Sequence, residues 1–122
     1  MAREQLLPGP DHPITIEPST EHVVVRAGDA VIADSGAALV LQESTYPPVY
    51  YVPLSDVDHE VLVDSATQTY CPYKGDASYY SVKGPDGEIA DAIWTYRAPY
   101  PAVAEIAGHV AFYSDRVAIT TG

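Results

Sequence analysis

The sequence predicts a mainly β protein of one domain, because short apolar or alternating segments recur along its 122 residues between turn-forming residues. Only the segment from Pro101 to Ala107 has clear helix signals, with proline in its first turn and Gly108 at its C-terminal end. The chain contains no internal repeat. This pattern predicts either a β-sandwich or an open barrel with one short helix near the C-terminus.

Residues 1–20 are expected to form an extended arm in front of a single domain over residues 21–122. Four prolines deny the arm regular backbone hydrogen bonding, whereas Ile14 and Ile16 alternate with polar residues as in an edge strand. We therefore expect the arm to lie along the body of the protein.

Short strands are predicted next, over residues 22–26, 30–34 and 37–43. The pairs Gly28-Asp29 and Ser35-Gly36 lie between them and favour close β-hairpins.

Glu43 is the first candidate functional residue. By the two-residue period of a strand it ends a face that otherwise consists of Ala37, Leu39 and Leu41. A carboxylate on such a face needs a partner or a water-lined opening. The alternative is that Glu43 has already returned to solvent at the end of the strand.

The middle of the chain cannot be helical over residues 46–53, where three prolines stiffen a loop that enters a short strand. Residues 54–57 are expected to form one helical turn, and residues 60–63 and 67–70 further strand pieces. The clearest hairpin joins residues 77–83 to residues 89–97, and residues 110–113 and 116–120 close the chain as two strands.

The turn before that hairpin contains the only cysteine, Cys71, and one of only six basic residues, Lys74. Pro72 forces Cys71 to be extended, and Gly75 offers the left-handed conformation that closes a turn. The thiol and the ammonium can therefore face one cavity. The alternative is that Cys71 is a small buried apolar residue and Lys74 a solvated one.

The charge excludes several classes of partner. Seventeen acidic and six scattered basic residues give a formal net charge of −11, which argues against nucleic acid and against anionic lipid. No apolar run is long enough to span a membrane, and the N-terminus lacks the pattern of a signal peptide. A single cysteine leaves no internal disulfide, so a cytoplasmic location is expected.

Ten tyrosines accompany one phenylalanine. A core needs only apolar rings, so this excess indicates that the hydroxyl groups form hydrogen bonds within the fold or line a wet cavity. Trp94 is expected to anchor the core. His12, His22 and His59 lie in polar segments whose spacing does not pair them, so no metal and no cofactor are expected.

Several blocks together resemble the bacterial domain-of-unknown-function family number 427. They are residues 7–16, residues 46–53 with Asp56-Val57, the segment Cys71-Pro72-Tyr73-Lys74-Gly75 with its flanks, Trp94-Thr95-Tyr96, and residues 106–117. The resemblance implies a β-tent-like fold of two small antiparallel sheets packed at an angle. Many β-tent proteins hold zinc through paired cysteines, which this chain lacks.

The family has also been given a nucleotidyltransferase label. Asp56 and Asp58 have the spacing of carboxylates that bind a divalent metal in such enzymes. The preceding residues 43–47 contain no glycine with which to cradle a phosphate. We therefore expect both acids to face water beside a helical turn.

The sequence thus predicts a pocket for a small polar ligand, anionic or zwitterionic. Lys74 would bind its negative group and Glu43 a donor or cationic group, while tyrosine hydroxyls orient it. The expected ligand-binding residues are Glu43, Tyr46, Tyr50, Cys71, Lys74, Tyr79 and His109.

Two alternatives stay open. One is an enzyme that uses the same pocket, with Cys71 as nucleophile and His109 as its base, or with Glu43 as general base. The other is a protein-interaction module that pairs through the arm or an edge strand. The sequence identifies neither the ligand, nor a catalytic residue, nor the oligomeric state.

Overall fold

The computed structural model describes residues 4–122, and residues 1–3 of the expected arm lie outside it. The strands are β1 (Ile14–Pro18), β2 (Val23–Ala27), β3 (Ala30–Ser35), β4 (Leu39–Glu43), β5 (Val49–Pro53), β6 (Leu62–Cys71), β7 (Gly75–Gly84), β8 (Gly87–Thr95), β9 (His109–Phe112) and β10 (Ala118–Thr121). Three short 3₁₀ helices occur among these residues: η1 (Leu54–Asp56), η2 (His59–Val61) and η3 (Pro101–Ile106). None of these described helices is long and apolar enough to cross a membrane.

The strands form two antiparallel sheets, which confirms the expected mainly β, tent-like class. The larger sheet has seven strands in the order β1-β4-β5-β9-β8-β7-β6, and the smaller has three in the order β10-β2-β3. Two small sheets were expected, whereas the observed sheets are of unequal size. The helix near the C-terminus is present as η3, in the tighter 3₁₀ form.

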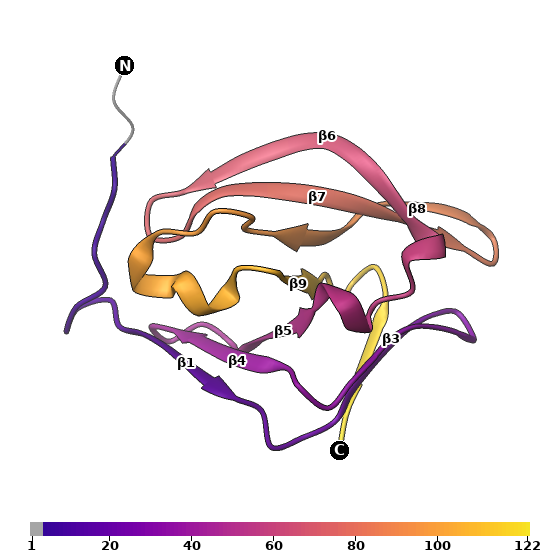
Figure 1. Ribbon diagram of the computed structural model, residues 1–122, viewed down its shortest axis with the longest axis horizontal. Helices are drawn as coiled ribbons and strands as arrows, with labels where there is room; N and C mark the ends of the chain where they lie inside the picture. The colour runs from indigo at the N-terminus through magenta and orange to yellow at the C-terminus, as the bar shows by residue number, and fades with distance from the viewer. Residues whose placement is uncertain (1–3) are drawn as a thin grey trace.

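The seven-stranded sheet is bent. Strands β1, β4 and β5 form one half, strands β8, β7 and β6 form the other, and β9 joins the two (Figure 1). Helix η3 lies in the opening between the halves. The bend therefore creates a concave side on which residues from distant parts of the chain meet.

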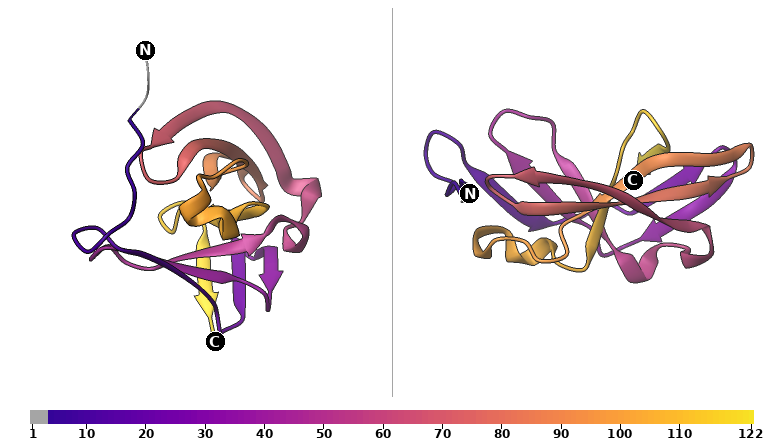
Figure 2. Two further views of the ribbon diagram at one scale, coloured as in Figure 1. Left: turned by 60° about the vertical axis from the view of Figure 1, so that its left-hand side comes forward. Right: turned by 90° about the horizontal axis from the view of Figure 1, so that it is seen from above.

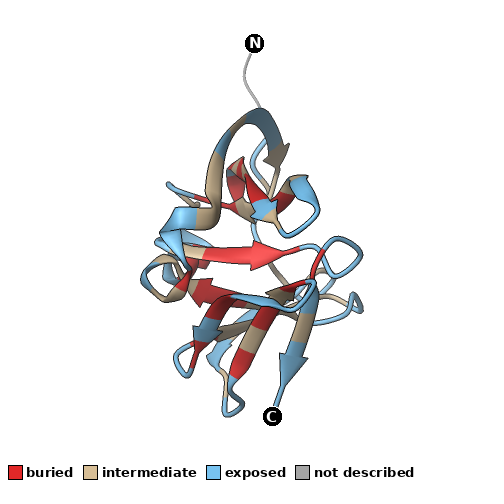
Figure 3. Cartoon of the chain, turned by 90° about the vertical axis from the view of Figure 1, so that its right-hand side faces the viewer, coloured by how far each residue is buried: buried red, intermediate tan, exposed pale blue. Residues whose placement is uncertain are grey.

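The first hydrophobic core lies where the smaller sheet packs against the larger one. The strands of the smaller sheet run side by side at a steep angle to β5 (Figure 2). Val23 and Val25 of β2 are fully buried against Val52 of β5 and Val110 of β9. The exposed strand β10 forms an edge of the smaller sheet beside the buried residues of β2 (Figure 3).

The second core fills the concave side of the bent sheet. Leu41 of β4, Tyr51 of β5 and Ala111 of β9 pack there with Val103 and Ile106 of η3. Because successive side chains of a strand point to opposite faces, β5 and β9 contribute to both cores. The candidate site lies beside this second core.

Two local expectations are wrong. Strands β2 and β3 form the expected hairpin, but β4 leaves β3 and pairs with β1 and β5 instead. Ser35 fixes this crossing, because its hydroxyl accepts from the Ala37 N–H at 3.1 Å and donates to Asp56 at 2.7 Å. Glu60 lies in η2 and not in a strand, because Asp58 caps this turn by accepting from the Glu60 N–H.

The N-terminal segment runs along both halves of the bent sheet. Strand β1 pairs with β4 on one half. Before it, the Leu6 N–H donates to the Pro72 carbonyl at 2.9 Å, and the Tyr70 hydroxyl donates to the Glu4 carbonyl at 2.6 Å on the other half. The segment therefore crosses the opening of the sheet at the end where β6 turns into β7 (Figure 1).

Candidate functional site

The β6–β7 turn presents Lys74 to the concave side of the sheet. The Lys74 N–H donates to the Cys71 carbonyl at 3.2 Å, and its carbonyl accepts from the Tyr100 N–H at 3.0 Å. Gly75 follows with φ of 112°, in the region that favours glycine, as the sequence predicts. The backbone on both sides of Lys74 is therefore fixed.

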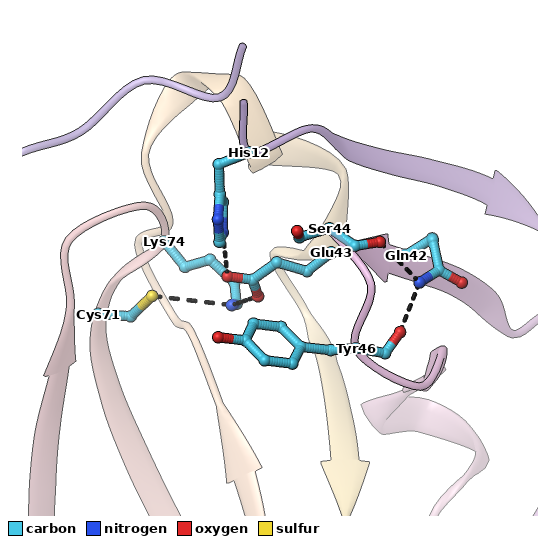
Figure 4. Close-up of polar contacts among 7 residues, drawn as sticks. All are labelled: His12, Gln42, Glu43, Ser44, Tyr46, Cys71 and Lys74. Carbon is cyan, nitrogen blue, oxygen red and sulfur yellow. Dashed lines mark hydrogen bonds and ion pairs between the residues drawn. The ribbon is translucent and has the colours of Figure 1, made fainter. Parts of the chain in front are cut away.

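Lys74 forms an ion pair with Glu43 across the bend. Its Nζ lies 2.5 Å from Glu43 Oε1, and the side chains are only 10% and 17% exposed (Figure 4). Glu43 ends β4 on one half of the sheet, whereas Lys74 precedes β7 on the other. The pair thus joins the two halves where the sheet opens.

His12 completes a triad with these two residues. Its Nε2 lies 2.8 Å from Glu43 Oε2, and its ring stacks on Tyr73 with 4.1 Å between the centroids. The sequence analysis placed His12 in a polar segment and gave it no partner, so this contact was missed. It depends on the β1–β4 register, which places Ile14 opposite Glu43 and cannot be read from the segment around His12 alone.

The triad sets the charge state of Glu43. Burial raises the pKa of its carboxyl group, but hydrogen bonds and Coulombic attraction from Lys74 and His12 outweigh burial, so the net pKa lies below the ordinary 4.5. Glu43 therefore contributes to stability as a carboxylate.

This shift predicts a contribution to acid sensitivity. Because the pKa of Glu43 is lower in the folded state, its stabilisation is complete above about pH 4.5 and is lost as the pH falls through the folded value. Urea unfolding from about pH 7 to pH 3 is expected to show a shallower loss of stability in Glu43→Gln than in the natural protein. Glu17→Gln, at an exposed position of β1, is the matched control and is expected to keep the natural profile. Parallel profiles for Glu43→Gln and the natural protein would contradict this prediction.

Beside the triad lies a cavity of about 220 Å³. Most of its wall consists of aromatic rings, with the Lys74 Nζ 5.8 Å from the centroid of the Tyr96 ring. The Trp94 indole N–H donates to the Tyr51 hydroxyl at 3.2 Å. The lining residues are Leu41, Glu43, Tyr46, Pro47, Val49, Tyr51, Lys74, Tyr79, Trp94, Tyr96 and Tyr113.

Three tyrosine hydroxyls of this wall, those of Tyr51, Tyr96 and Tyr113, stay protonated at neutral pH. Burial raises the pKa of Tyr51 and of Tyr96 well above the ordinary 10. Burial, together with Tyr79, raises the pKa of Tyr113 to about 12. These groups can therefore both donate and accept hydrogen bonds.

The structure brings together four of the seven residues expected in the pocket, namely Glu43, Tyr46, Lys74 and Tyr79, which all line the cavity. Cys71 does not line it, but its Sγ lies 3.7 Å from the Lys74 Nζ. Tyr50 lines an adjoining cavity instead.

His109 lies apart from the site. It does not line the cavity, and its Nδ1 lies 3.0 Å from the Ala107 carbonyl oxygen. No hydrogen bond links His109 to Cys71 within residues 4–122, so the thiol is not paired with the base that the enzyme alternative assigned to it.

Sequence reasoning missed much of the wall. Tyr51, Trp94, Tyr96 and Tyr113 were not predicted as site residues. Trp94 was expected to anchor the core, and it packs against the second core as well as lining the cavity. The excess of tyrosine over phenylalanine was the available signal, but it does not show which rings share a face across different strands.

The two aspartates that suggested a nucleotidyltransferase have structural partners. Asp56 accepts from Ser35, as described above, and Asp58 caps η2. Asp56 is the last residue of η1 and Asp58 comes directly before η2, and neither lines the cavity beside Lys74.

These features define a mainly β, tent-like domain whose bent sheet holds an aromatic cavity beside a buried ion pair. The family model described as a domain of unknown function, DUF427, matches residues 15–121, so the chain belongs to that family. Lys74 and Glu43 lie within the matched range and His12 just outside it. A comparison with curated proteins finds no match.

Proposed function

We propose that the cavity binds a small polar metabolite, anionic or zwitterionic, and that Lys74 is its main anchor. The supporting observation is the placement of Lys74, which is the one buried charged side chain among residues 4–122. It lies on the wall of a 220 Å³ cavity, a space suited to a small molecule. Burying an ammonium group is costly, which favours a role for it there.

The ammonium has capacity for a ligand. It has three N–H donors, of which Glu43 accepts one and the Cys71 sulfur is a weak acceptor for another. The remaining donor can bind a carboxylate or another anionic group in the cavity. Each Glu43 oxygen has a further lone pair for a ligand donor, and the hydroxyls of Tyr46 and Tyr79 can orient the ligand.

Binding fits the site better than catalysis. Both Glu43 oxygens accept hydrogen bonds from neighbours that favour the charged form, which weakens it as a base. Cys71 has no hydrogen bond to His109 among the described residues. Such a fixed ion pair and ring wall are typical of a preorganised binding site.

The partner is thus a small molecule, and neither nucleic acid nor a membrane surface is proposed, because the net charge of −11 opposes both. A cytoplasmic location is proposed from the lone cysteine. The interaction-module alternative has less support, since Glu4 and Leu6 of the arm already bind the body of the protein.

The test is a thermal-shift screen of small carboxylates, phosphates and amino acids against three proteins: the natural protein, the double variant Lys74→Met with Glu43→Leu, and Tyr46→Leu. The double variant removes both charges, so no buried charge is left unpaired. Tyr46 is 59% exposed at the rim, so its replacement should not disturb folding. A ligand of this cavity is expected to stabilise the natural protein, to lose its effect in the double variant and to bind Tyr46→Leu more weakly. Ligands that bind all three proteins equally would overturn the proposal.

A further inference from the structure

A second cavity, of about 390 Å³, adjoins the first. Both are lined by Tyr46, Pro47, Val49, Trp94 and Tyr113, so these residues form a shared wall. The second cavity is lined in addition by Pro48, Tyr50, Phe112, Ser114, Asp115 and Ile119. A ligand bound near Lys74 in the first cavity therefore has room to extend into the second cavity.

The chemistry of the second cavity differs from that of the first. Its wall contains four other aromatic rings besides Tyr46, and among residues 4–122 Asp115 is the one charged residue that lines it. No arginine or lysine of this described range lines it. The cavity therefore combines electron-rich rings with a single negative charge, as sites for organic cations do.

The rings are held in place by the fold. Trp94 and Tyr113 lie with their centroids 4.5 Å apart at an angle of 46°, and the Trp94 indole N–H is bound to Tyr51. Phe112 is buried in the first core, and Tyr50 packs against that core. The ring wall therefore needs little ordering when a ligand binds.

Asp115 is available to a ligand. It is exposed beside Tyr113, and it has no hydrogen-bond or ion-pair partner in the part of the chain that the structure describes. Arg116, the next residue, lines a third cavity together with Asp115 and Asp91. Coulombic attraction from Arg116 helps to lower the pKa of Asp91. A carboxylate at the edge of an aromatic wall attracts a cation without desolvating its own charge completely.

We propose that the second cavity is a subsite for an alkylated ammonium group, trimethylammonium above all. This inference rests on the proposed function: it makes the ligand a zwitterion whose carboxylate meets Lys74 and whose cationic end lies among Trp94, Tyr113 and Asp115. A primary ammonium is strongly hydrated and needs several acceptors, which rings do not supply. A methylated one sheds water readily and binds ring faces through its positive methyl groups.

The first experiment tests the subsite independently of Lys74. Choline and its neutral isostere 3,3-dimethylbutan-1-ol are titrated calorimetrically into the natural protein, Asp115→Asn, Tyr113→Leu and Asp86→Asn. Choline is expected to bind roughly tenfold more tightly than the isostere, and Asp115→Asn and Tyr113→Leu to weaken it severalfold. Asp86, on the exposed turn between β7 and β8, is the control for overall charge and should leave binding unchanged. Equal affinity for choline and the isostere, or equal effects of Asp86→Asn and Asp115→Asn, would overturn the inference.

The second experiment tests the link between the two cavities. Trimethylammonio carboxylates with one, two and three methylene groups between the charged ends are titrated into the natural protein and the Lys74→Met, Glu43→Leu double variant. At least one is expected to bind more tightly than choline and to fall back to the affinity of choline in the double variant. If every trimethylammonio carboxylate binds like choline in both proteins, the inference that the ligand is a zwitterion is wrong. The proposed function is then still decided by the thermal-shift screen of metabolites. If small carboxylates need Lys74 but choline fails to bind, the cationic subsite alone is wrong.

Discussion

Replacing Lys74 by methionine is expected to lower the free energy of unfolding by about 3 kcal/mol. Methionine keeps most of the apolar stem, but Glu43 is left as a largely buried carboxylate whose remaining partner among residues 4–122 is His12. Removing one partner of a buried ion pair costs far more than the pair itself contributes, because the remaining charge stays desolvated. Urea unfolding at neutral pH measures the change.

The matched control is Lys83→Met, which removes a lysine from an exposed position of β7 and is expected to change stability by less than about 0.5 kcal/mol. Adding Glu43→Leu to Lys74→Met is expected to recover most of the lost stability, because no buried charge then lacks a partner. Equal effects of Lys74→Met and Lys83→Met would show that the ammonium is solvated in solution.

Truncating Ile106 to alanine is expected to cost about 3 kcal/mol, in the usual range for a buried isoleucine. Helix η3 has little stability of its own: it is a 3₁₀ segment without a side-chain cap, and Val103 inside it departs from helical geometry with φ of −128°. Val103 and Ile106, both fully buried in the second core, hold it against the sheet. Ile106→Ala should therefore also speed hydrogen exchange throughout η3.

Glu105→Ala is the control for this prediction, since Glu105 is the exposed neighbour of Ile106 in the same helix. It is expected to leave both stability and exchange within error of the natural protein. Faster exchange that spreads evenly over the chain in Ile106→Ala, without a local excess in η3, would contradict the local role of Ile106.

Sequence reasoning located most strands but not their partners. Alternation and turn residues predict β2, β7 and β8 well, because these signals are local. Whether residues 37–43 return beside β3 or cross to another sheet depends on contacts such as Ser35 with Asp56, which are 21 residues apart in the chain. No local pattern contains that information.

The candidate site shows the same division. Glu43 and Lys74 stand out in the sequence because each places a charge where the local pattern calls for an apolar or turn residue. Their ion pair bridges β4 and the β6–β7 turn, and its third member, His12, comes from the segment before β1. His109 was expected to act as the base for Cys71 in the enzyme alternative, but whether the two side chains meet depends on the bend of the sheet, which no local pattern shows.

The double role of β5 and β9 links the two cores. Side chains of β5 and β9 are buried alternately in one core and in the other. Loss of packing in one core therefore also disturbs the strands that the other core packs against. Thermal unfolding should accordingly be a single cooperative transition. A ligand that stabilises the cavity beside Lys74 should also slow hydrogen exchange at the valines on the opposite side of β5 and β9.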